Sequence, residues 1–496
     1  MALVVPSKLS SPSPFSALFS RYDINGTYDE MFDAAGRPRS YCRPLFEDLR
    51  AASHAELRQR QLEADKAFLT QGITFTVYGD EEGTERIFPF DLLPRIVTAA
   101  EWRTLERGLT QRLTAINLFL KDVYHDGRIL AEGVVPRDLV QSCRHYRREM
   151  RGVHLHRDIY VSVAGTDLLR LEDGRFVVLE DNLRVPSGVS YMLANREVTR
   201  RVFPALFDRY RVAPIAQYGQ MLLATLRAQA PPNVSDPTFV VLTPGVGNSA
   251  YFEHAFLARE MGVALVEGRD LLVHDNVVYM RTTAGLRRVD VIYRRVDEDF
   301  LDPLTFKRTS LLGVPGLMNV YREGNVAIAN APGAGVADDK AVYAYMPALI
   351  KYYLDQDPLL GQVPTYVGLR GDDFAYMRDN LGKLVVKTTG DSGGYNMLMG
   401  PFATRKEIDA YAAQLKKAPG NYIAQPLIEL SSHPTWIDGN FEPRRIDLRP
   451  FILYGETIRV LPGGLTRVAL RPGSYVVNSS QGGGSKDTWV LAPRSS

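Results

Sequence analysis

Residues 177–184 carry the stretch Val-Val-Leu-Glu-Asp-Asn-Leu-Arg, an apolar run that ends abruptly in charged and amide side chains. The β-branched start predicts a strand over Phe176–Glu180. Because side chains of an extended segment alternate between its two faces, Glu180 and Asn182 are expected to point to one side and Asp181 to the other. Asn and Arg contribute little to strand stability, so this ending favours a chemical role over a solvated strand end.

A second strand is predicted just before this one, over Asp158–Val163, with Asp167 following it. Two adjacent antiparallel strands would then carry Asp167 and Glu180. Together with Asn182 they offer the carboxylate and amide oxygens that suit Mg²⁺ shared with the phosphates of a nucleotide. Arg184 is two residues further on and would point toward the same centre, where it could hold a carboxylate through two hydrogen bonds.

A second group of polar residues lies toward the C-terminus. The strand Leu384-Val-Val-Lys387 leads into a Gly-rich loop with Gly393 and Gly394, and Asp338-Asp339-Lys340 opens a helix. A Gly-rich loop can present its amides to phosphates, and a lysine adds a fixed positive charge, although such a loop is also common in plain hairpins. Further along, paired strands are expected to carry Arg449 and Arg467.

A different chemistry is suggested by Gly245-Val-Gly-Asn-Ser-Ala250, which fits the pattern G-x-G-x-x-A between a strand and a helix. Glu267 follows 20 residues after Gly247, as an acidic residue does in dinucleotide-binding sites. The other interpretation is a tight strand-to-helix turn in a Rossmann-like unit that binds something else. The sequence leaves both interpretations open.

Two other pairs are ambiguous. His154 and His156 would share one face of a strand, as metal ligands or as hydrogen-bonded residues at a cleft wall. Arg294 and Arg295 follow a predicted strand, where they could meet a second carboxylate or simply cover the sheet edge.

Composition limits the possible functions. The 496 residues predict two to four structural units, with ordinary hydrophobic and charged fractions of 45% and 23%. A net charge of +2 provides no field for nucleic acid or an anionic membrane, so neither is expected as a partner. The start of the chain does not have the pattern of a signal peptide, and two cysteines are too few for a disulfide framework. We therefore expect a cytoplasmic protein of mixed α/β (α+β) class.

Taken together, these segments resemble the ATP-grasp ligases, but in a permuted order. The Asp-Lys pair, Val-Val-Lys with its Gly-rich flap, an apolar hinge strand at 421–430, Asp-x-Arg and Gly-Gly-x-x-Arg occupy 339–467. Gly-x-Asp and Glu-x-Asn-x-Arg, which usually come last, occupy 165–184. The chain is thus similar to a circularly permuted ATP-grasp protein with a Rossmann-like pre-ATP-grasp unit between its two halves.

The resemblance implies a division of the chain and a set of roles. The expected units are a loose arm at 1–20, a helical and strand region at 21–95, the metal-binding half at 96–229, the pre-ATP-grasp unit at 230–332 and the nucleotide-binding half at 333–496. The implied contacts with ATP are those of Lys340, Lys387, Gly393, Gly394, Gln425, Leu427 and Glu429. The implied Mg²⁺ ligands are Asp167, Glu180 and Asn182, and the implied catalytic residues are Arg184, Arg449 and Arg467.

The family also implies a reaction. ATP phosphorylates a substrate carboxylate to an acyl phosphate, and an amine then displaces phosphate, with small-molecule or peptide carboxylates and amines as substrates. Two alternatives stay open at this point: an NAD-dependent oxidoreductase that uses Gly245–Ala250, and a nucleotide-binding scaffold that has lost turnover.

Overall fold

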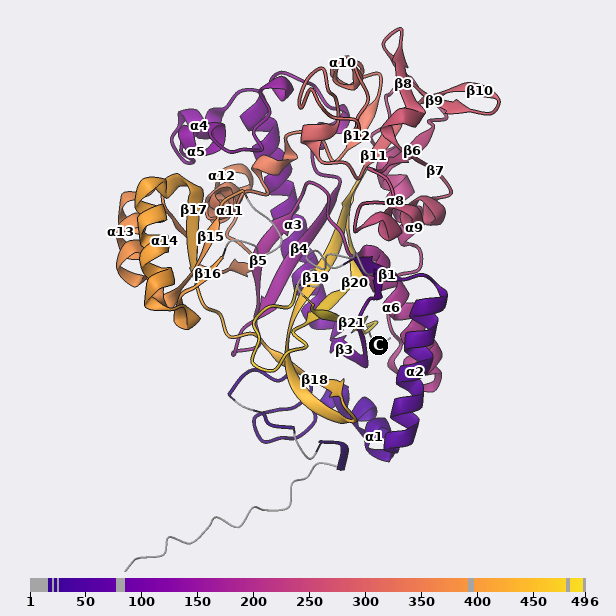
Figure 1. Ribbon diagram of the computed structural model, residues 1–496, viewed down its shortest axis with the longest axis vertical. Helices are drawn as coiled ribbons and strands as arrows, with labels where there is room; N and C mark the ends of the chain where they lie inside the picture. Colours follow the sequence, from indigo (N-terminus) through magenta and orange to yellow (C-terminus); the bar gives the residue numbers. More distant parts are fainter. Residues whose placement is uncertain are drawn as a thin grey trace, which may run out of the picture.

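A computed structural model of the chain describes residues 17–19, 22–24, 26–76, 85–390, 397–478 and 482–493 (Figure 1). Its largest element is an eight-stranded sheet built from both ends of the sequence. Along the sheet the order is β13 (Gly361–Gln362), β5 (Phe176–Asn182), β4 (Val163–Arg170), β19 (Asn440–Tyr454), β20 (Ile458–Val468), β21 (Gly484–Val490) and β3 (Phe90–Val97), and β18 (Ser432–Ile437) pairs with β19.

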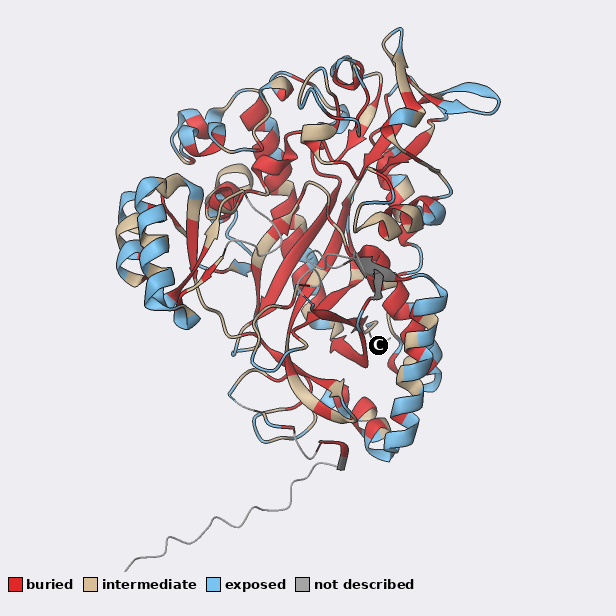
Figure 2. Cartoon of the chain, viewed as in Figure 1, coloured by how far each residue is buried: buried red, intermediate tan, exposed pale blue. Residues whose placement is uncertain are grey.

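The centre of this sheet is the antiparallel pairing of β4 with β19, two strands that lie far apart in the sequence. Every residue of β4 is buried, and Figure 2 colours the strands in the middle of the sheet mainly as buried. Thr166, Asp167 and Arg170 are buried along with the apolar residues of this strand, so their polar groups need partners inside the protein. The expected strand at Asp158–Val163 is wrong, because Arg157 and Asp158 have φ of +62° and +56°, which no extended strand allows.

Helices cover the sheet, and the longest begins where its capping box predicts. The Thr98 side chain accepts a hydrogen bond from Glu101 N, and the Glu101 carboxylate accepts one from Thr98 N, so α3 begins at Ala99. The helices of the N-terminal half are α1 (Arg43–Ala51), α2 (His54–Thr70), α3 (Ala99–Tyr124), α4 (Arg128–Ala131), α5 (Arg137–Gln141), α6 (Val189–Val202), α7 (Pro204–Tyr210) and α8 (Tyr218–Arg227). A small antiparallel pair, β1 (Thr74–Thr76) and β2 (Glu85–Ile87), lies near α2.

A second sheet is entirely parallel, with the order β12 (Ala327–Ala329), β11 (Val291–Arg294), β6 (Phe239–Leu242) and β7 (Ala264–Val266). Helix α9 (Tyr251–Met261) follows β6 in the strand–turn–helix order that the glycine pattern predicts, and α10 (Leu317–Arg322) leads into β12. An antiparallel arm of β8 (Leu271–His274), β9 (Val277–Thr282) and β10 (Gly285–Val289) projects from this part (Figure 1). That residues 230–332 form a Rossmann-like pre-ATP-grasp unit stays a prediction, as do the bounds of all five predicted units.

Another four-stranded sheet forms the centre of a lobe. Its strand order is β14 (Tyr366–Val367), β17 (Tyr422–Pro426), β15 (Leu384–Thr388) and β16 (Leu398–Met399). Its helices are α13 (Gly371–Asn380) and α14 (Arg405–Lys417), whose outer faces are exposed in Figure 2. Two further helices, α11 (Lys340–Tyr343) and α12 (Met346–Leu354), precede the lobe. The result is a mixed α/β protein with several sheets, as expected. Across the described ranges, no helix has both the length and the apolar character needed to cross a bilayer.

The sheets are tied together by Asn330, a fully buried residue that follows β12. Its side-chain oxygen accepts hydrogen bonds from the backbone amides of Ser162 and Val163, both 2.9 Å long. Its side-chain nitrogen donates to the carbonyls of Val163 and Leu183 at 2.6 and 2.7 Å. One amide side chain thus satisfies the backbone at the start of β4 and the end of β5.

We expect Asn330→Ala to destabilise the protein by at least about 3 kcal/mol, because several buried backbone groups would lose their partners. The midpoint of urea unfolding measures the loss. Asn380→Ala is the control, since within the described residues its side chain makes only an exposed hydrogen bond to the Tyr376 carbonyl and its loss should change the midpoint little. Equal midpoints for the two variants would contradict the role given to Asn330.

Candidate functional site

The β4–β5 hairpin brings two predicted metal ligands together. Asp167 on β4 lies directly opposite Glu180 on β5, and Asn182 donates a hydrogen bond to Asp167 at 3.4 Å. Asp181 faces the other way, where its carboxylate accepts from Arg112 at 2.8 and 3.0 Å. The alternation predicted for this segment is therefore confirmed, and the three oxygen-bearing side chains lie side by side.

Two arginines from the C-terminal strands contact the same carboxylate. Arg449 on β19 donates two hydrogen bonds to Asp167 at 2.5 and 2.8 Å, and Arg467 on β20 donates one at 2.7 Å. Arg467 also pairs with Asp447, and both aspartates are fully buried. Burial alone would raise the pKa of Asp167, but the charges of Arg449 and Arg467 outweigh it and hold the pKa well below its usual range.

Glu180 has the opposite electrostatic setting. Burial, and after it the neighbouring charge of Asp167, raises the pKa of Glu180, although Lys340 and Lys387 partly counter this. The Lys340 amine lies 4.0 Å from the Glu180 carboxylate. Burial lowers the pKa of Lys387, whose amine donates to Gln425 at 2.8 Å. Two carboxylates with pKa values pushed apart, next to two lysines, form the kind of charged cluster that functional sites contain.

A single cavity between the lobe and the central sheet gathers most of the predicted residues. Its charged end is lined by Asp167, Glu180, Lys340, Lys387, Asp447 and Arg467. Its other end is apolar and is lined by Leu179, Val385, Met399, Leu427, Leu430 and Val477, with Gln425 between the two ends. A cavity with one apolar and one charged end suits a ligand of the same polarity, such as a nucleotide.

Three predicted residues take positions around this cavity rather than in its wall. Asn182 and Arg449 donate hydrogen bonds to Asp167, which itself lines the cavity. Glu429 accepts hydrogen bonds from Arg445 and from the Tyr475 hydroxyl. Gly393 and Gly394 fall outside the described residues. Asp447 also lines the cavity but was not predicted as a site residue, and neither was the wall formed by 475–478, for which the sequence has no recognisable signal.

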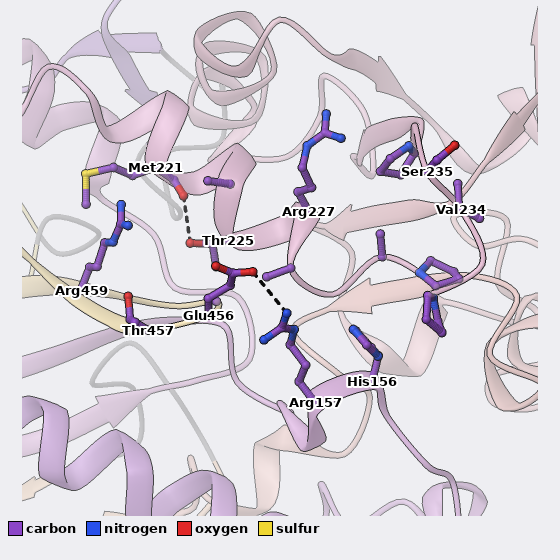
Figure 3. Close-up of a pocket in the computed structure, with 17 residues that line it drawn as sticks. His156, Arg157, Met221, Thr225, Arg227, Val234, Ser235, Glu456, Thr457 and Arg459 are labelled. Atoms are coloured by element: carbon purple, nitrogen blue, oxygen red, sulfur yellow. Dashed lines mark hydrogen bonds and ion pairs between the residues drawn. The ribbon is translucent and has the colours of Figure 1, made fainter.

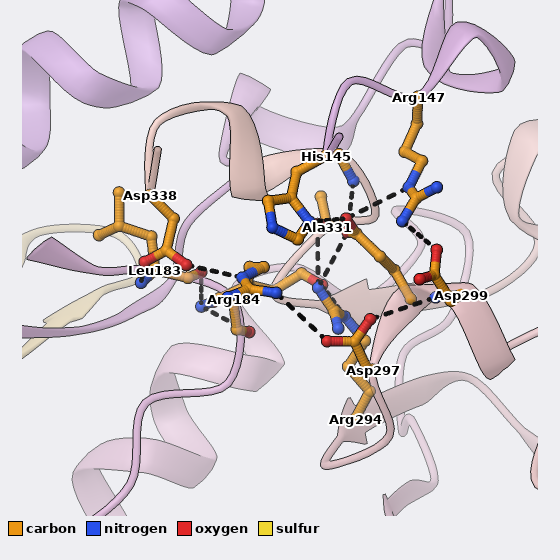
Figure 4. A network of polar contacts seen from close by, with 12 residues as sticks. His145, Arg147, Leu183, Arg184, Arg294, Asp297, Asp299, Ala331 and Asp338 are labelled. Carbon is orange, nitrogen blue, oxygen red and sulfur yellow. Dashed lines mark hydrogen bonds and ion pairs between the residues drawn. The ribbon is translucent and has the colours of Figure 1, made fainter. Parts of the chain in front are cut away.

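Arg184 does not point toward the carboxylate centre, contrary to the prediction. Strand β5 ends at Asn182, so the alternation that placed Arg184 beside Glu180 no longer applies. Figure 4 shows its guanidinium between two aspartates, with Asp338 at 2.6 Å and Asp297 at 3.4 Å.

A short segment between the two halves of the chain consists of Asp338, Asp339 and Lys340, and we call it the joint. The Asp338 carboxylate accepts from both Leu183 N and Arg184. Cys143 donates to Asp339, and Lys340 lies near Glu180. Each residue of the joint therefore contacts the N-terminal half, which fixes Lys340 relative to the strand that carries Glu180.

The remaining ambiguous pairs are now placed. His154 and His156 lie outside any strand, His156 in a short 3-10 helix (His156–Asp158), so the shared strand face is wrong. Arg294 and Arg295 are fully buried and bond within the protein rather than covering a sheet edge. Arg295 donates to Glu253 and to the Pro186 carbonyl.

The donor set fits Mg²⁺ better than a transition metal. Among the residues described by the structure, no group of three or more His, Cys, Asp or Glu side chains is arranged to hold a metal ion. Two carboxylates and one amide oxygen are instead the partial set with which proteins bind Mg²⁺, whose other ligands are waters and substrate phosphates. Asp167, Glu180 and Asn182 provide that set.

Comparison with known proteins agrees with this arrangement. The family model described as circularly permuted ATP-grasp type 2 matches residues 94–469. The chain belongs to this family, which confirms the resemblance inferred from the permuted motifs. The match extends from within β3 to just after β20 and therefore includes the cavity residues from Asp167 to Arg467, but not the wall at 475–478.

Several relatives align along almost the whole chain. An uncharacterized protein of Synechocystis sp. is 54% identical over 471 residues, which cover 95% of this chain and 98% of that protein. An uncharacterized protein of Mycobacterium tuberculosis is 51% identical over 491 residues, covering 98% of this chain and 88% of that protein. A Frankia alni protein, provisionally named glutamate--cysteine ligase 2-3, is 43% identical over 492 residues. That match covers 99% of this chain but 56% of the Frankia protein.

Among solved structures, the apo form of a glutathione synthetase-like effector from Globodera pallida is similar in fold. The TM-score is 0.59, and the match covers 89% of this chain and 98% of that chain. The sequence identity is 12%, so the likeness concerns the fold alone.

We expect Asp167→Asn to destabilise the protein by about 3–5 kcal/mol near pH 7, because two buried arginines would lose a charged partner. An aspartate whose pKa is lowered by folding stabilises the protein above its unfolded pKa of about 3.9 and loses that contribution as the pH falls further. The difference between wild type and variant should therefore shrink below about pH 4. Urea midpoints measured from pH 7 downward test this.

The matched control for this series is Asp173→Asn, at the exposed turn of the same hairpin, where Arg175 is the only partner of Asp173 in the part of the chain that the structure describes. Its midpoints should follow those of the wild type. A difference between wild type and Asp167→Asn that stayed constant across the pH range would contradict the ionic role of Asp167.

Proposed function

We propose that the protein is an ATP-dependent carboxylate–amine ligase that forms ADP and passes through an acyl phosphate. One observation carries the proposal: Lys340 and Lys387 from the nucleotide-binding half face Asp167 and Glu180 from the metal-binding half across one cavity. Membership of the ATP-grasp family supports the use of ATP. The names of the Frankia and Globodera proteins, a ligase and a synthetase-like effector, agree with amide bond formation.

The apolar end of the cavity is suited to the base of ATP. Val385, Met399 and Leu427 offer apolar contacts there. Burying a base against them would stabilise the complex, because apolar surface is removed from water. The Gln425 side chain makes two hydrogen bonds: its oxygen accepts from the Lys387 amine, and its nitrogen donates to the Thr365 hydroxyl at 2.9 Å. We propose that this amide borders the base and holds Lys387 toward the phosphates.

The charged end is suited to the phosphates. Lys340 and Lys387 provide two positive charges, and Gly393 and Gly394 are proposed to cover the phosphates from the flap. Asp167, Glu180 and Asn182 would hold Mg²⁺ here. When bound, Mg²⁺ neutralises phosphate charge and thereby favours phosphoryl transfer.

The reaction is then mainly a matter of positioning. A carboxylate oxygen of the substrate attacks the γ-phosphorus of ATP, the bond from that phosphorus to the β–γ bridging oxygen breaks, and ADP leaves. The amine nitrogen next attacks the acyl carbon, phosphate leaves, and the nitrogen gives up a proton. Arg449 and Arg467 are proposed to orient the transferred phosphoryl group, because guanidinium groups match phosphate geometry through paired hydrogen bonds.

Arg184 takes a different role in this proposal from the one that the family pattern implies. Its guanidinium is engaged by Asp338 and Asp297, and it does not line the cavity. We propose that it is a positioning residue, which holds the joint and so places Lys340 beside Glu180.

The oxidoreductase alternative receives less support. Gly245 has φ of +102°, which favours glycine, and a side chain there would meet the Glu267 carboxylate at 3.2 Å. Gly245–Ala250 joins β6 to α9 as a tight turn, a conformation that both interpretations of this stretch require. Family membership favours ATP over NAD.

We expect Glu180→Gln to abolish the Mg²⁺-dependent rise in unfolding midpoint that ATP causes in the wild type. A ligand at about 100 times its dissociation constant adds about 2.7 kcal/mol of stability, which differential scanning fluorimetry detects easily. Glu172→Gln, at the exposed turn of the same hairpin, is the control and should keep the full response. A full ATP response in folded Glu180→Gln would exclude the metal assignment.

Turnover separates the ligase from a scaffold. We expect ADP release when wild-type protein receives Mg-ATP with the correct pair from a panel of carboxylates and amines, and none from Lys387→Ala. If the substrate carboxylate carries ¹⁸O, one labelled oxygen should appear in the released phosphate, because the acyl phosphate transfers it. Tight ATP binding without turnover on any pair would favour the scaffold, and a midpoint shift with NADH alone would favour the oxidoreductase.

A further inference from the structure

The short segment 186–188 lies directly before helix α6 and next to Arg449, the arginine proposed above to orient the phosphoryl group. The Ser187 carbonyl accepts a hydrogen bond from the Arg449 guanidinium at 3.3 Å. A side chain on Gly165 would meet both Arg449 and Pro186, at 3.4 and 3.5 Å, so the segment and the arginine pack on one spot of β4. The placement of this segment therefore affects the direction in which Arg449 points.

Two charged residues next to the parallel sheet hold the other backbone groups of this segment. Arg295, which follows β11, donates to the Pro186 carbonyl at 2.7 Å, and Glu253 on α9 accepts from the Gly188 amide at 2.7 Å. The two charged side chains also pair with each other at 3.1 Å. Three consecutive residues are thus bonded to three charged side chains, two from this pair and the third from Arg449.

Glu253 also supplies the cap that α6 lacks. The N-cap residue Gly188 has no side chain to cap the helix, and its φ of +113° is a conformation that favours glycine. The Glu253 carboxylate accepts instead from the Ser190 amide at 3.2 Å and from the Ser190 hydroxyl at 2.9 Å. A negative charge is stabilised at a helix N-terminus by the amides that point toward it. The start of α6 is therefore fixed from α9.

The pair is buried and its charges balance each other. Glu253 is fully buried, and 4% of Arg295 is exposed. Burial, and after it the charge of Arg295, lowers the pKa of the neighbouring His254 to about 2, so this imidazole adds no second positive charge. Among the residues that the structure describes, the Arg295 Nε has no hydrogen-bond partner. The guanidinium is thus oriented toward Glu253 and Pro186 although one of its own buried donors stays unbonded, which costs free energy.

We propose that Arg295 and Glu253 are positioning residues for phosphoryl transfer. They hold the 186–188 segment, and the Ser187 carbonyl in turn keeps Arg449 aimed at the transferred phosphoryl group when Mg²⁺ draws away its carboxylate partner. This inference rests on the proposed function, and it gives the parallel sheet a part in the chemistry of a cavity that neither residue lines. A misplacement of about 1 Å in such a group can lower a rate by about a hundredfold.

The test compares the dissociation constants of three ligands by titration calorimetry. They are Mg-ATP, Mg-ADP, and Mg-ADP with aluminium fluoride, which imitates the phosphoryl group during transfer. In the wild type we expect aluminium fluoride to tighten the binding of Mg-ADP by at least about a hundredfold, as transition-state analogues do.

Glu253→Gln keeps the size of the side chain and an acceptor oxygen but removes the charge. We expect this variant to bind Mg-ATP and Mg-ADP within about twofold of the wild type and to lose at least about tenfold of the gain from aluminium fluoride, because Arg449 acts only on the group in transfer. A merely structural pair would lower the unfolding midpoint and leave this gain intact. If folded Glu253→Gln keeps the whole gain, the proposal is overturned.

Glu456→Gln is the matched control, since Glu456 also pairs with an arginine, Arg157, at 3.2 Å. Figure 3 shows this pair in a hollow between α8 and the tip of the β19–β20 hairpin, and the hollow shares no lining residue with the nucleotide cavity. The control should keep the whole gain from aluminium fluoride. A loss of the gain in Glu456→Gln equal to that in Glu253→Gln would also overturn the proposal.

A second variant covers the case in which Glu253→Gln does not fold. Arg295→Lys keeps a positive charge opposite Glu253, but a single amine cannot hold both Glu253 and the Pro186 carbonyl in one fixed fork. It should lose the same part of the gain. Combined with Arg449→Lys it should lose no more than Arg449→Lys alone, because both changes act through one guanidinium. Additive losses would contradict the proposal.

The wild type separates the failure of this inference from the failure of the proposed function. No gain from aluminium fluoride in the wild type would overturn the proposed phosphoryl transfer, and this inference with it. A gain in the wild type that both Glu253→Gln and Arg295→Lys retain would overturn this inference alone.

Discussion

The buried carboxylate of Asp167 between the guanidinium groups of Arg449 and Arg467 is the interaction on which the rest of the structure depends. These residues lie on three neighbouring strands, β4, β19 and β20, which come from opposite ends of the chain. A buried charge without a partner costs several kcal/mol, so the N-terminal strand and the C-terminal hairpin stabilise one another only when both are in register. The permuted order of the chain is therefore compatible with one continuous sheet.

The same contact constrains the proposed chemistry. In this structure Asp167 is the partner of two arginines, and in the proposed complex it also holds Mg²⁺. A divalent cation beside Asp167 would weaken the hold of that carboxylate on the guanidinium groups, because like charges repel at short range. Arg467 keeps Asp447 as a second partner, whereas the only carboxylate bonded to Arg449 in the described residues is Asp167. In the proposed complex, Arg449 would thus be the arginine more readily released toward a phosphoryl group.

The sequence predicted elements with strong local signals and missed features set by long-range contacts. Thr98 and Glu101 fix the start of α3, and strand periodicity placed Glu180 and Asp181 on opposite faces, because both effects act within a few residues. The prediction for Arg184 was wrong because periodicity applies only while the strand continues. Strand β5 ends at Asn182, and the next carbonyl, that of Leu183, accepts a hydrogen bond from the Asn330 side chain instead of from a strand. Nothing local to 475–478 indicates that it forms a cavity wall, since only the packing of that loop against the lobe creates it.

The joint of Asp338, Asp339 and Lys340 connects the central sheet to a lobe whose core is only partly separate. The small core of the lobe includes Leu384, Val386 and Ala424, whereas Val367 and Ile423 of the same lobe belong to the main core. A movement of the lobe would carry Lys387 with it because Lys387 lies on β15. Lys340 is held differently: its amine lies 4.0 Å from Glu180 and its neighbour Asp338 is bonded to Leu183 and Arg184, but its backbone amide also donates to the Thr389 carbonyl just after β15. The two lysines therefore have different supports: Lys387 is carried by a strand of the lobe, and Lys340 lies between the lobe and the carboxylates of the central sheet.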